Sequence, residues 1–196
     1  MGIEDLVLIP RSIEVAYQDP LDIIWIRAAL DLGIQVRRDP AVFASWDGAS
    51  TLTIGTGDTL DPDDSLAQLI FHELCHAMVE GSDAFLRPDW GLENVDDRDA
   101  IREHACLRLQ ATLAAPHGLR SLLAATTDYR AYYDALPDDP MIEDSDPAIP
   151  VARQGLDRAR NPPWRDPVQR ALTATARILD VVGEFASVGS IWRLPQ

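Results

Sequence analysis

The sequence predicts an α+β domain that is mainly helical and carries a small antiparallel sheet. Apolar residues recur at helical spacing in several long segments, and two short β-like runs flank an Asp-Gly turn. The chain has 196 residues, which suits a single domain over residues 1–196 with a core that needs no disulfide bonds.

The first predicted helix covers residues 19–33. Asp19 can cap this helix, Pro20 suits its first position, and Gly33 can end it. A short β-like run follows at residues 35–38.

A β-hairpin is predicted next, ahead of the most distinctive helix. Residues 42–46 and 51–55 can pair across Asp47-Gly48, because this dipeptide favours the tight turn that joins antiparallel strands.

The next predicted helix begins at Asp61-Pro62 and ends at Gly81. Asp61 can accept hydrogen bonds from free backbone N–H groups, and Pro62 is harmless in a first turn. Apolar residues then recur at helical spacing through Leu66, Leu69, Ile70, Leu74 and Met78.

The second half of the chain is predicted as further helices and one irregular excursion. Proline and glycine interrupt residues 81–95, which we expect to form a loop. Six prolines fall in residues 136–165, which we expect to be a Pro-rich excursion with room for a short helix at 151–159. Helices are expected over residues 97–115, 119–135 and 166–187.

Residues 72–76 read His-Glu-Leu-Cys-His, a single His-Glu-x-x-His (HExxH) motif. On a helix, His72 and His76 share one face, so both imidazoles can reach one metal ion. Glu73 can take a proton from a metal-bound water as a general base. The composition of the chain predicts about 0.003 accidental matches, so we interpret the motif as metal-binding.

A catalytic metal needs a third protein ligand, and the following predicted helix offers Glu103 and His104. Neighbouring helical residues point about 100° apart, so only one of the two can face the metal easily. Glu103 shares a stripe with residues that look packed and is the expected ligand, with His104 as the alternative or as a partner behind a ligand. Two His and one Glu can hold zinc or ferrous iron.

Three other side chains have competing interpretations. Cys75 and Cys106 are the only cysteines, and we expect two buried core residues rather than ligands, although their thiols would approach each other if the two helices pack. Asp89 is either a turn former or an acceptor for the outer N–H of His76.

The order of these elements resembles the gluzincin-type layout of small zincin-like metallopeptidases. A helix and short strands precede the HExxH helix, and a later helix carries Glu103. The resemblance implies a zinc metalloprotease in which the strand at residues 51–55 pairs with a peptide substrate. The Asn-Glu motif of well-known gluzincins is missing, because Arg102 precedes Glu103.

Residues 50–115 are also similar to the elongation factor P hydroxylase family. The similarity lies in the HExxH motif followed by Gly81, in Asp89-Trp90-Gly91 and in the later Glu103. It implies non-haem iron held by His72, His76 and Glu103, and hydroxylation of a protein side chain.

Charge and composition exclude several kinds of partner. The net charge of −15 argues against a nucleic-acid or anionic membrane surface. No stretch has transmembrane length, and the N-terminus lacks the positive charge of a secretory signal, so we expect a cytoplasmic protein.

The sequence therefore predicts a metal-dependent enzyme that acts on a peptide or protein substrate. The favoured hypothesis is a zinc-dependent hydrolase of peptidase type, with Glu73 as the general base. The alternatives are an iron-dependent protein hydroxylase and a non-enzymatic interaction module, whose structural metal would be closed by Cys75 or His104. The excursion at residues 136–165 is either a lid or an inert loop, and the sequence carries no signal for oligomeric state.

Overall fold

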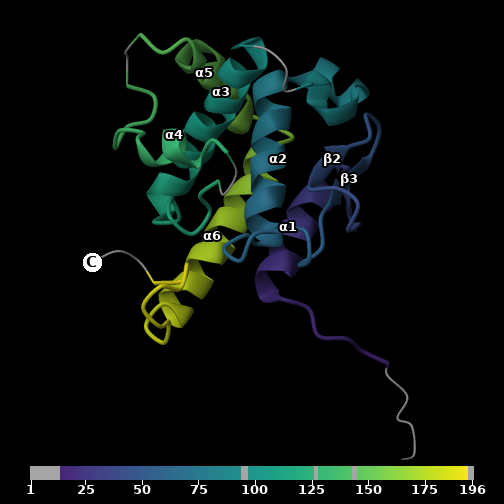
Figure 1. Ribbon diagram of the computed structural model, residues 1–196, viewed down its shortest axis with the longest axis vertical. Helices are drawn as coiled ribbons and strands as arrows, with labels where there is room; N and C mark the ends of the chain where they lie inside the picture. Colours follow the sequence, from purple (N-terminus) through teal and green to yellow (C-terminus); the bar gives the residue numbers. More distant parts are fainter. Residues whose placement is uncertain (1–13, 94–96, 126–127, 143–144, 194–196) are drawn as a thin grey trace, which may run out of the picture.

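The computed structural model describes residues 14–93, 97–125, 128–142 and 145–193, which contain six α-helices and a three-stranded sheet. Helix α2 (Leu66–Glu80) runs through the centre (Figure 1). Helix α1 (Pro20–Asp31) and the sheet lie on one side of α2, and α3 (Asp97–Ala114) lies on the other. The predicted α+β class is confirmed.

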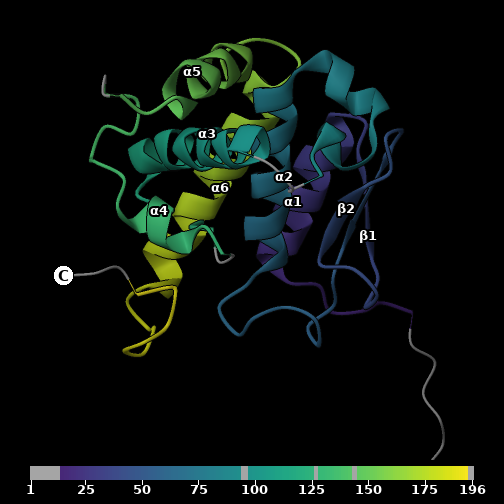
Figure 2. The same ribbon diagram turned by 45° about the horizontal axis from the view of Figure 1, so that its top comes forward.

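Two C-terminal helices complete the packing around this centre (Figure 2). Helix α5 (Ala148–Ala159) contacts both α2 and α3, and α6 (Arg165–Val182) packs along α1. One large apolar cluster therefore joins α1, α2, α3, α5, α6 and the sheet.

The sheet contains β1 (Gln35–Arg38), β2 (Ala44–Trp46) and β3 (Thr51–Ile54) in the order β1-β3-β2. The predicted hairpin is confirmed, since β2 and β3 pair antiparallel. Strand β1 pairs with β3 in parallel, so the sheet is mixed rather than wholly antiparallel. Strand β3 takes the centre because it carries two fully buried apolar side chains, Leu52 and Ile54.

This order overturns one expectation for substrate binding. A peptide can extend a sheet only along a free strand edge. Residues 51–54 are hydrogen-bonded to β1 on one side and to β2 on the other. The prediction that this strand pairs with a peptide substrate is therefore wrong, because neither edge of β3 is free.

The Asp-Gly turn forms as expected, and its side chain explains why. The carboxylate of Asp47 accepts hydrogen bonds from the backbone N–H groups of Ala49, Ser50 and Thr51 at 2.7–3.0 Å. The bond from Thr51 is the strongest of the influences that lower the pKa of Asp47 to about 2. Gly48 has a φ of +76°, which a residue with a side chain adopts only with strain.

Helix α1 confirms the first predicted helix. The carboxylate of Asp19 accepts from the backbone N–H of Leu21 at 2.8 Å, and Pro20 occupies the first turn. Trp25 of α1 packs on Phe71 of α2, with ring centroids 4.8 Å apart. This contact fixes α1 against the helix that carries the HExxH motif.

The predicted start of α2 at Asp61 is wrong. The helix begins at Leu66, and the hydroxyl of Ser65 accepts from the backbone N–H of Gln68 at 3.2 Å. Asp61 lies in a separate turn, where its backbone N–H donates to the Asp64 carboxylate at 2.8 Å. The predicted end is confirmed, because Gly81 ends the helix with a φ of +85°.

The segment at 81–95, predicted as a loop, differs in part from the prediction, whereas the helix predicted at 97–115 is present. The loop contains two short 3₁₀ helices, Ser82–Leu86 and Pro88–Gly91, whereas residues 94–96 lie outside the described part of the chain. The helix prediction is confirmed by α3, and the last predicted helix is confirmed by α6, which ends at Val182.

The predicted helix at 119–135 is wrong over most of its length. Only Arg130–Asp134 (α4) is helical, and residues 126–127 lie outside the described residues. The backbone carbonyls of Leu123 and Ala124 accept hydrogen bonds from the side chains of Gln110 and Gln68. Side-chain amides from α2 and α3 therefore bind this segment in place of helical hydrogen bonds.

The Pro-rich excursion contains α5, which starts three residues before the expected short helix. The guanidinium of Arg108 on α3 anchors the segment before α5. It donates to the carbonyl of Pro140 at 2.5 Å and to the carboxylate of Asp146 at 2.9 Å. A buried Arg thus ties the excursion to the helix that also carries Glu103.

Within the described residues, none of the helices combines the length and the apolar character that a membrane crossing requires.

Candidate metal centre

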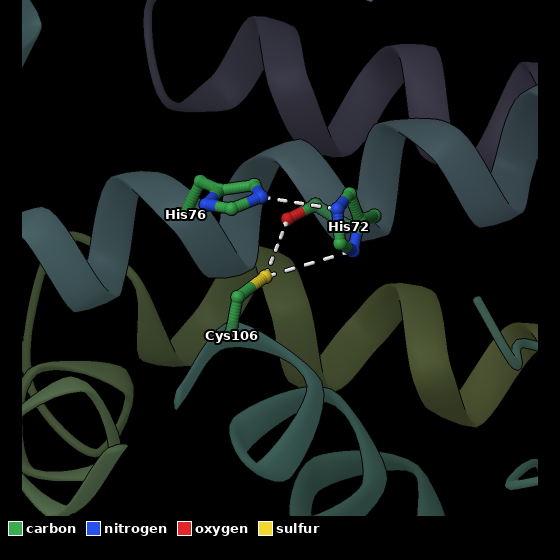
Figure 3. A group of neighbouring side chains, drawn as sticks. All are labelled: His72, His76 and Cys106. Carbon is green, nitrogen blue, oxygen red and sulfur yellow. Dashed lines mark hydrogen bonds between the residues drawn. The ribbon is translucent and has the colours of Figure 1, made fainter. Parts of the chain in front are cut away.

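Helix α2 places the two motif histidines next to each other in space (Figure 3). The rings of His72 and His76 have centroids 4.6 Å apart and meet at 89°. Their Nε2 atoms are 3.0 Å apart. Because residues i and i+4 share a helix face, both Nε2 lone pairs can reach one point beside α2.

Helix α3 brings Glu103 to the same point. Oε2 of Glu103 lies 3.2 Å from Nε2 of His76 and 3.7 Å from Nε2 of His72. The three side chains are 10%, 4% and 12% exposed, respectively, so they are largely shielded from water. The third residue predicted from sequence is therefore beside the motif, and His104 is not.

The separations of these three atoms match the size of one metal ion. Tetrahedral bonds of about 2.0–2.2 Å hold ligand atoms about 3.3–3.6 Å apart. The observed separations of 3.0–3.7 Å bracket this range. The spacing of these three atoms is therefore that of donor atoms around one divalent cation.

Cys106 approaches the same histidine from its other nitrogen. Its Sγ lies 3.6 Å from Nδ1 of His72 and 3.4 Å from the His72 carbonyl oxygen (Figure 3). One ligand atom each from His72, His76 and Cys106 fall within 4.8 Å of one another, so these residues form a candidate metal-binding group. Two ligand sets therefore share the histidines and differ in the third donor.

The electrostatics of the site favour a positive charge between His76 and Glu103. Burial lowers the pKa of His72, and the charge of His76 lowers it further. Burial also acts to lower the pKa of His76, but the Glu103 carboxylate outweighs it and raises that pKa. Burial acts to raise the pKa of Glu103, but His76 and then His72 lower it to about 2. A carboxylate and two imidazoles so arranged suit a bound cation.

The thiols of Cys75 and Cys106 are both free and buried, and they come close enough to interact. Burial, followed by the contact with Cys75, raises the pKa of Cys106 well above its usual value. The protonated thiol is therefore the favoured form of Cys106 in the metal-free protein. The expectation that both cysteines are buried and approach each other is confirmed, whereas the expectation that they are not ligands is not, because Cys106 belongs to the candidate metal-binding group.

Glu73 points its carboxylate at an aromatic side chain from the turn after α2. The indole Nε1 of Trp90 donates to Oε2 of Glu73 at 2.7 Å. The charge of Glu73 also acts to raise the pKa of both His72 and His76, although burial and His76 keep the pKa of His72 below its usual value. Glu73 therefore lies at the rim of the group, with one carboxylate oxygen held by Trp90.

Two alternatives from the sequence are corrected by these positions. Asp89 accepts from the backbone N–H of Trp46 at 3.0 Å, rather than from His76. Nδ1 of His76 is buried without a hydrogen-bond partner among the described residues. His104 stacks face to face on Tyr132, with ring centroids 3.7 Å apart, and, like Glu103, it is not one of the three residues of the candidate metal-binding group.

Sequence reasoning missed the roles of Trp90 and Gln110. Oε1 of Gln110 lies 3.0 Å from Nδ1 of His72. Gln110 follows Glu103 by seven residues, so the helical stripe that indicated Glu103 also places Gln110 on the metal-facing side. No sequence periodicity predicts the contact of Trp90 with Glu73, because the direction of the Trp90 side chain depends on a turn in which Asp89 and Trp90 both have positive φ.

No protein-family model, curated protein or solved structure matches this chain. The zincin-like and hydroxylase-like resemblances therefore rest on their motifs alone, and the structure supports the coarser conclusion that His72, His76 and Cys106 form a candidate metal-binding group in a mainly helical α+β protein.

Proposed function

We propose that the protein is a zinc-dependent hydrolase of peptidase type, with His72, His76 and Glu103 as the metal ligands. One observation carries the proposal: three donor atoms from two helices lie 3.0–3.7 Å apart in a largely buried position. The contact between Gln110 and Nδ1 of His72 supports Glu103 over Cys106, because it leaves Nε2 of His72, the nitrogen near Glu103, for the cation.

Glu73 is the proposed general base. When bound in such a site, zinc lowers the pKa of a coordinated water to about 7. Oε2 of Glu73 is held by Trp90, and its other carboxylate oxygen is the one we assign to accept the proton. Holding one oxygen limits rotation of the carboxylate, so the accepting oxygen keeps one position relative to His72.

A peptide or protein is the proposed substrate class. Because β3 is paired along both edges, we propose that the substrate is held without strand addition to β3. The net charge of −15 favours cationic substrates over anionic ones during encounter.

The ligand set itself favours a second candidate, an iron-dependent protein hydroxylase. Two histidines and one carboxylate with open positions also form the site of non-haem iron oxygenases. Elemental analysis of protein purified without added metal separates the two candidates when combined with an oxygen-uptake assay. Zinc without oxygen uptake eliminates the hydroxylase, and iron with oxygen uptake eliminates the hydrolase.

The proximity of Cys106 favours a third candidate, a structural metal held by two histidines and one thiolate. This candidate requires Cys106 to lose its proton on binding. It predicts that Cys106→Ser abolishes zinc binding, whereas the hydrolase proposal predicts that Cys106→Ser retains it. It also predicts a large drop in melting temperature on chelation and no turnover of any substrate.

The proposed hydrolase is tested with zinc-loaded protein and a library of fluorogenic peptides. We expect Glu73→Gln to abolish cleavage while the zinc content stays unchanged, because the amide cannot accept the proton. We expect His72→Ala or His76→Ala to remove the zinc itself. Full turnover by Glu73→Gln would overturn the assignment of Glu73.

A further inference from the structure

Gln110 on α3 makes two hydrogen bonds that together define its orientation. Its side chain is completely buried. Nε2 donates to the backbone carbonyl of Leu123 at 2.6 Å, and Oε1 lies 3.0 Å from Nδ1 of His72. The amide therefore bridges a backbone carbonyl and a proposed metal ligand.

The bridge determines which nitrogen of His72 carries the hydrogen. The Leu123 carbonyl can only accept, so the NH₂ group of Gln110 must face it. The opposite orientation would place two acceptor oxygens 2.6 Å apart in a buried position. With Oε1 facing His72 as an acceptor, Nδ1 of His72 must be the donor. In the neutral ring, Nε2 is then unprotonated.

The nearby thiol is consistent with this assignment. Sγ of Cys106 has the His72 carbonyl oxygen as an acceptor for its own hydrogen at 3.4 Å. Cys106 therefore has no need to donate to Nδ1, from which it lies 3.6 Å away. Each polar group around Nδ1 of His72 has a compatible partner when Nδ1 carries the hydrogen.

We propose that Gln110 is a positioning residue that holds His72 in its Nδ1–H tautomer and so directs the lone pair of Nε2 at the metal. Partners behind metal-binding histidines are usually carboxylates, backbone carbonyls or waters, and here a buried amide takes that place. The effect on metal affinity rests on the proposed metal site. The tautomer itself is a property of the metal-free protein and does not depend on that proposal.

Gln68 provides a matched control inside the same protein. It lies four residues before His72 on α2, it is buried, and its Nε2 donates to the carbonyl of Ala124 at 3.2 Å. Its Oε1 has no hydrogen-bond partner among the described residues. Gln68 and Gln110 therefore hold neighbouring carbonyls of the same segment, but only Gln110 is hydrogen-bonded to His72.

The test measures the tautomer of His72 by ¹⁵N NMR in zinc-free protein, and zinc affinity by competition with a chromophoric chelator. The variants are Gln110→Met, Gln110→Glu and Gln68→Met. We expect the Nδ1–H tautomer in the unaltered protein and in Gln68→Met. Gln110→Met should lose the single tautomer and bind zinc about 10- to 100-fold more weakly.

Gln110→Glu distinguishes positioning from simple packing. In its protonated form, the Glu side chain can still accept from Nδ1 of His72 with its carbonyl oxygen and donate to the Leu123 carbonyl with its hydroxyl, so both contacts of Gln110 are kept. We expect the tautomer and the zinc affinity of Gln110→Glu to remain at least those of the unaltered protein.

Two results would overturn the proposal. One is an Nε2–H tautomer of His72 in the unaltered protein, which decides the question even if a variant fails to fold. The other is an equal loss of zinc affinity in Gln110→Met and Gln68→Met, which would show that both residues act only through the segment they hold. If the unaltered protein has the Nδ1–H tautomer but binds no zinc, the metal proposal fails and the tautomer assignment stands.

Discussion

The carboxylate of Glu73 is held by the indole N–H of Trp90 in a hydrogen bond of 2.7 Å. The indole is itself fixed, because it stacks on Trp46 with ring centroids 4.6 Å apart and nearly parallel planes. Asp89 accepts from the backbone N–H of Trp46, and both Asp89 and Trp90 have positive φ, a conformation that costs free energy. The hairpin and the turn after α2 therefore hold Trp90 against the proposed base.

We expect Trp90→Phe to lower peptide cleavage while leaving zinc content unchanged. Phenylalanine keeps an aromatic ring against Trp46 but removes the donor to Glu73. A hydrogen bond to a charged group contributes about 1.5–3 kcal/mol to the stability of the folded protein. We expect Trp90→Phe to lose an amount near the lower end of this range, because Glu73 is only half-buried. Urea unfolding measures the stability, elemental analysis the zinc, and the fluorogenic peptides the turnover.

Trp25→Phe is the control for this substitution. Its indole donates to the hydroxyl of Thr175 at 3.0 Å, between α1 and α6. Trp25→Phe should lose stability without a specific effect on turnover. Equal turnover in Trp90→Phe and Trp25→Phe would show that the bond to Glu73 has no part in the reaction.

Arg108→Ala should destabilise the protein by about 1–3 kcal/mol, because it leaves the buried Pro140 carbonyl and the half-buried Asp146 carboxylate without their donor. Arg108 is 3% exposed and also donates to the hydroxyl of Tyr132 at 2.6 Å, besides Pro140 and Asp146. The segment around Pro140 should become open to limited proteolysis.

Arg130→Ala is the matched control for Arg108→Ala. Arg130 forms an exposed pair with Asp134 one turn away, and such pairs contribute about 0.3–0.5 kcal/mol. Similar unfolding free energies for the two variants would contradict the anchoring role of Arg108. A larger loss of unfolding free energy in Arg108→Ala than in Arg130→Ala would indicate that the excursion at residues 136–165 is fixed to α3 rather than a freely moving lid.

The hairpin turn should lose stability in acid through Asp47. Its folded pKa of about 2 lies below the unfolded value near 3.8, so its contribution is present above pH 4 and is lost as the pH falls toward 2. Asp47→Asn keeps an acceptor that does not titrate. Urea unfolding from pH 7 to pH 2 should show the advantage of Asp47 over Asn shrinking, and a constant difference would refute this account.

The start of α2 can be tested by removing each candidate cap. Ser65→Ala should cost about 1 kcal/mol, because the hydroxyl satisfies the backbone N–H of Gln68. Asp61→Ala should change the stability by less than about 0.5 kcal/mol, because Asp61 lies outside the helix. Thermal unfolding of the two variants measures both values, and the reverse order would restore Asp61 as the cap.

Local signals in the sequence predicted the elements whose ends are determined by neighbouring residues. Asp19-Pro20 indicated the start of α1, and Asp47-Gly48 indicated the hairpin, because both act over a few residues. The segment at 119–125 failed because its carbonyls bind glutamines from α2 and α3, which no local pattern reveals. The parallel pairing of β1 with β3 was also not predicted, because it depends on β3 lying at the centre of the sheet, where Leu52 and Ile54 are buried.

In the candidate site, too, local sequence patterns predicted some positions, and contacts between distant segments determined the others. Helical periodicity was sufficient to place His72 and His76 together and to favour Glu103 over His104. It did not place Trp90, whose indole reaches Glu73 through a turn with unusual dihedral angles. It also gave no reason to expect Cys106 at Nδ1 of His72, since that contact depends on how α2 and α3 pack.

The most direct test of the metal site is the zinc content of four proteins after zinc loading and dialysis: the unaltered chain, Glu103→Ala, His104→Ala and Cys106→Ser. We predict about one zinc ion per chain in the unaltered protein, in His104→Ala and in Cys106→Ser, and almost none in Glu103→Ala. An unaltered protein without zinc, or a Glu103→Ala variant that retains it while Cys106→Ser does not, would contradict the proposed ligand set.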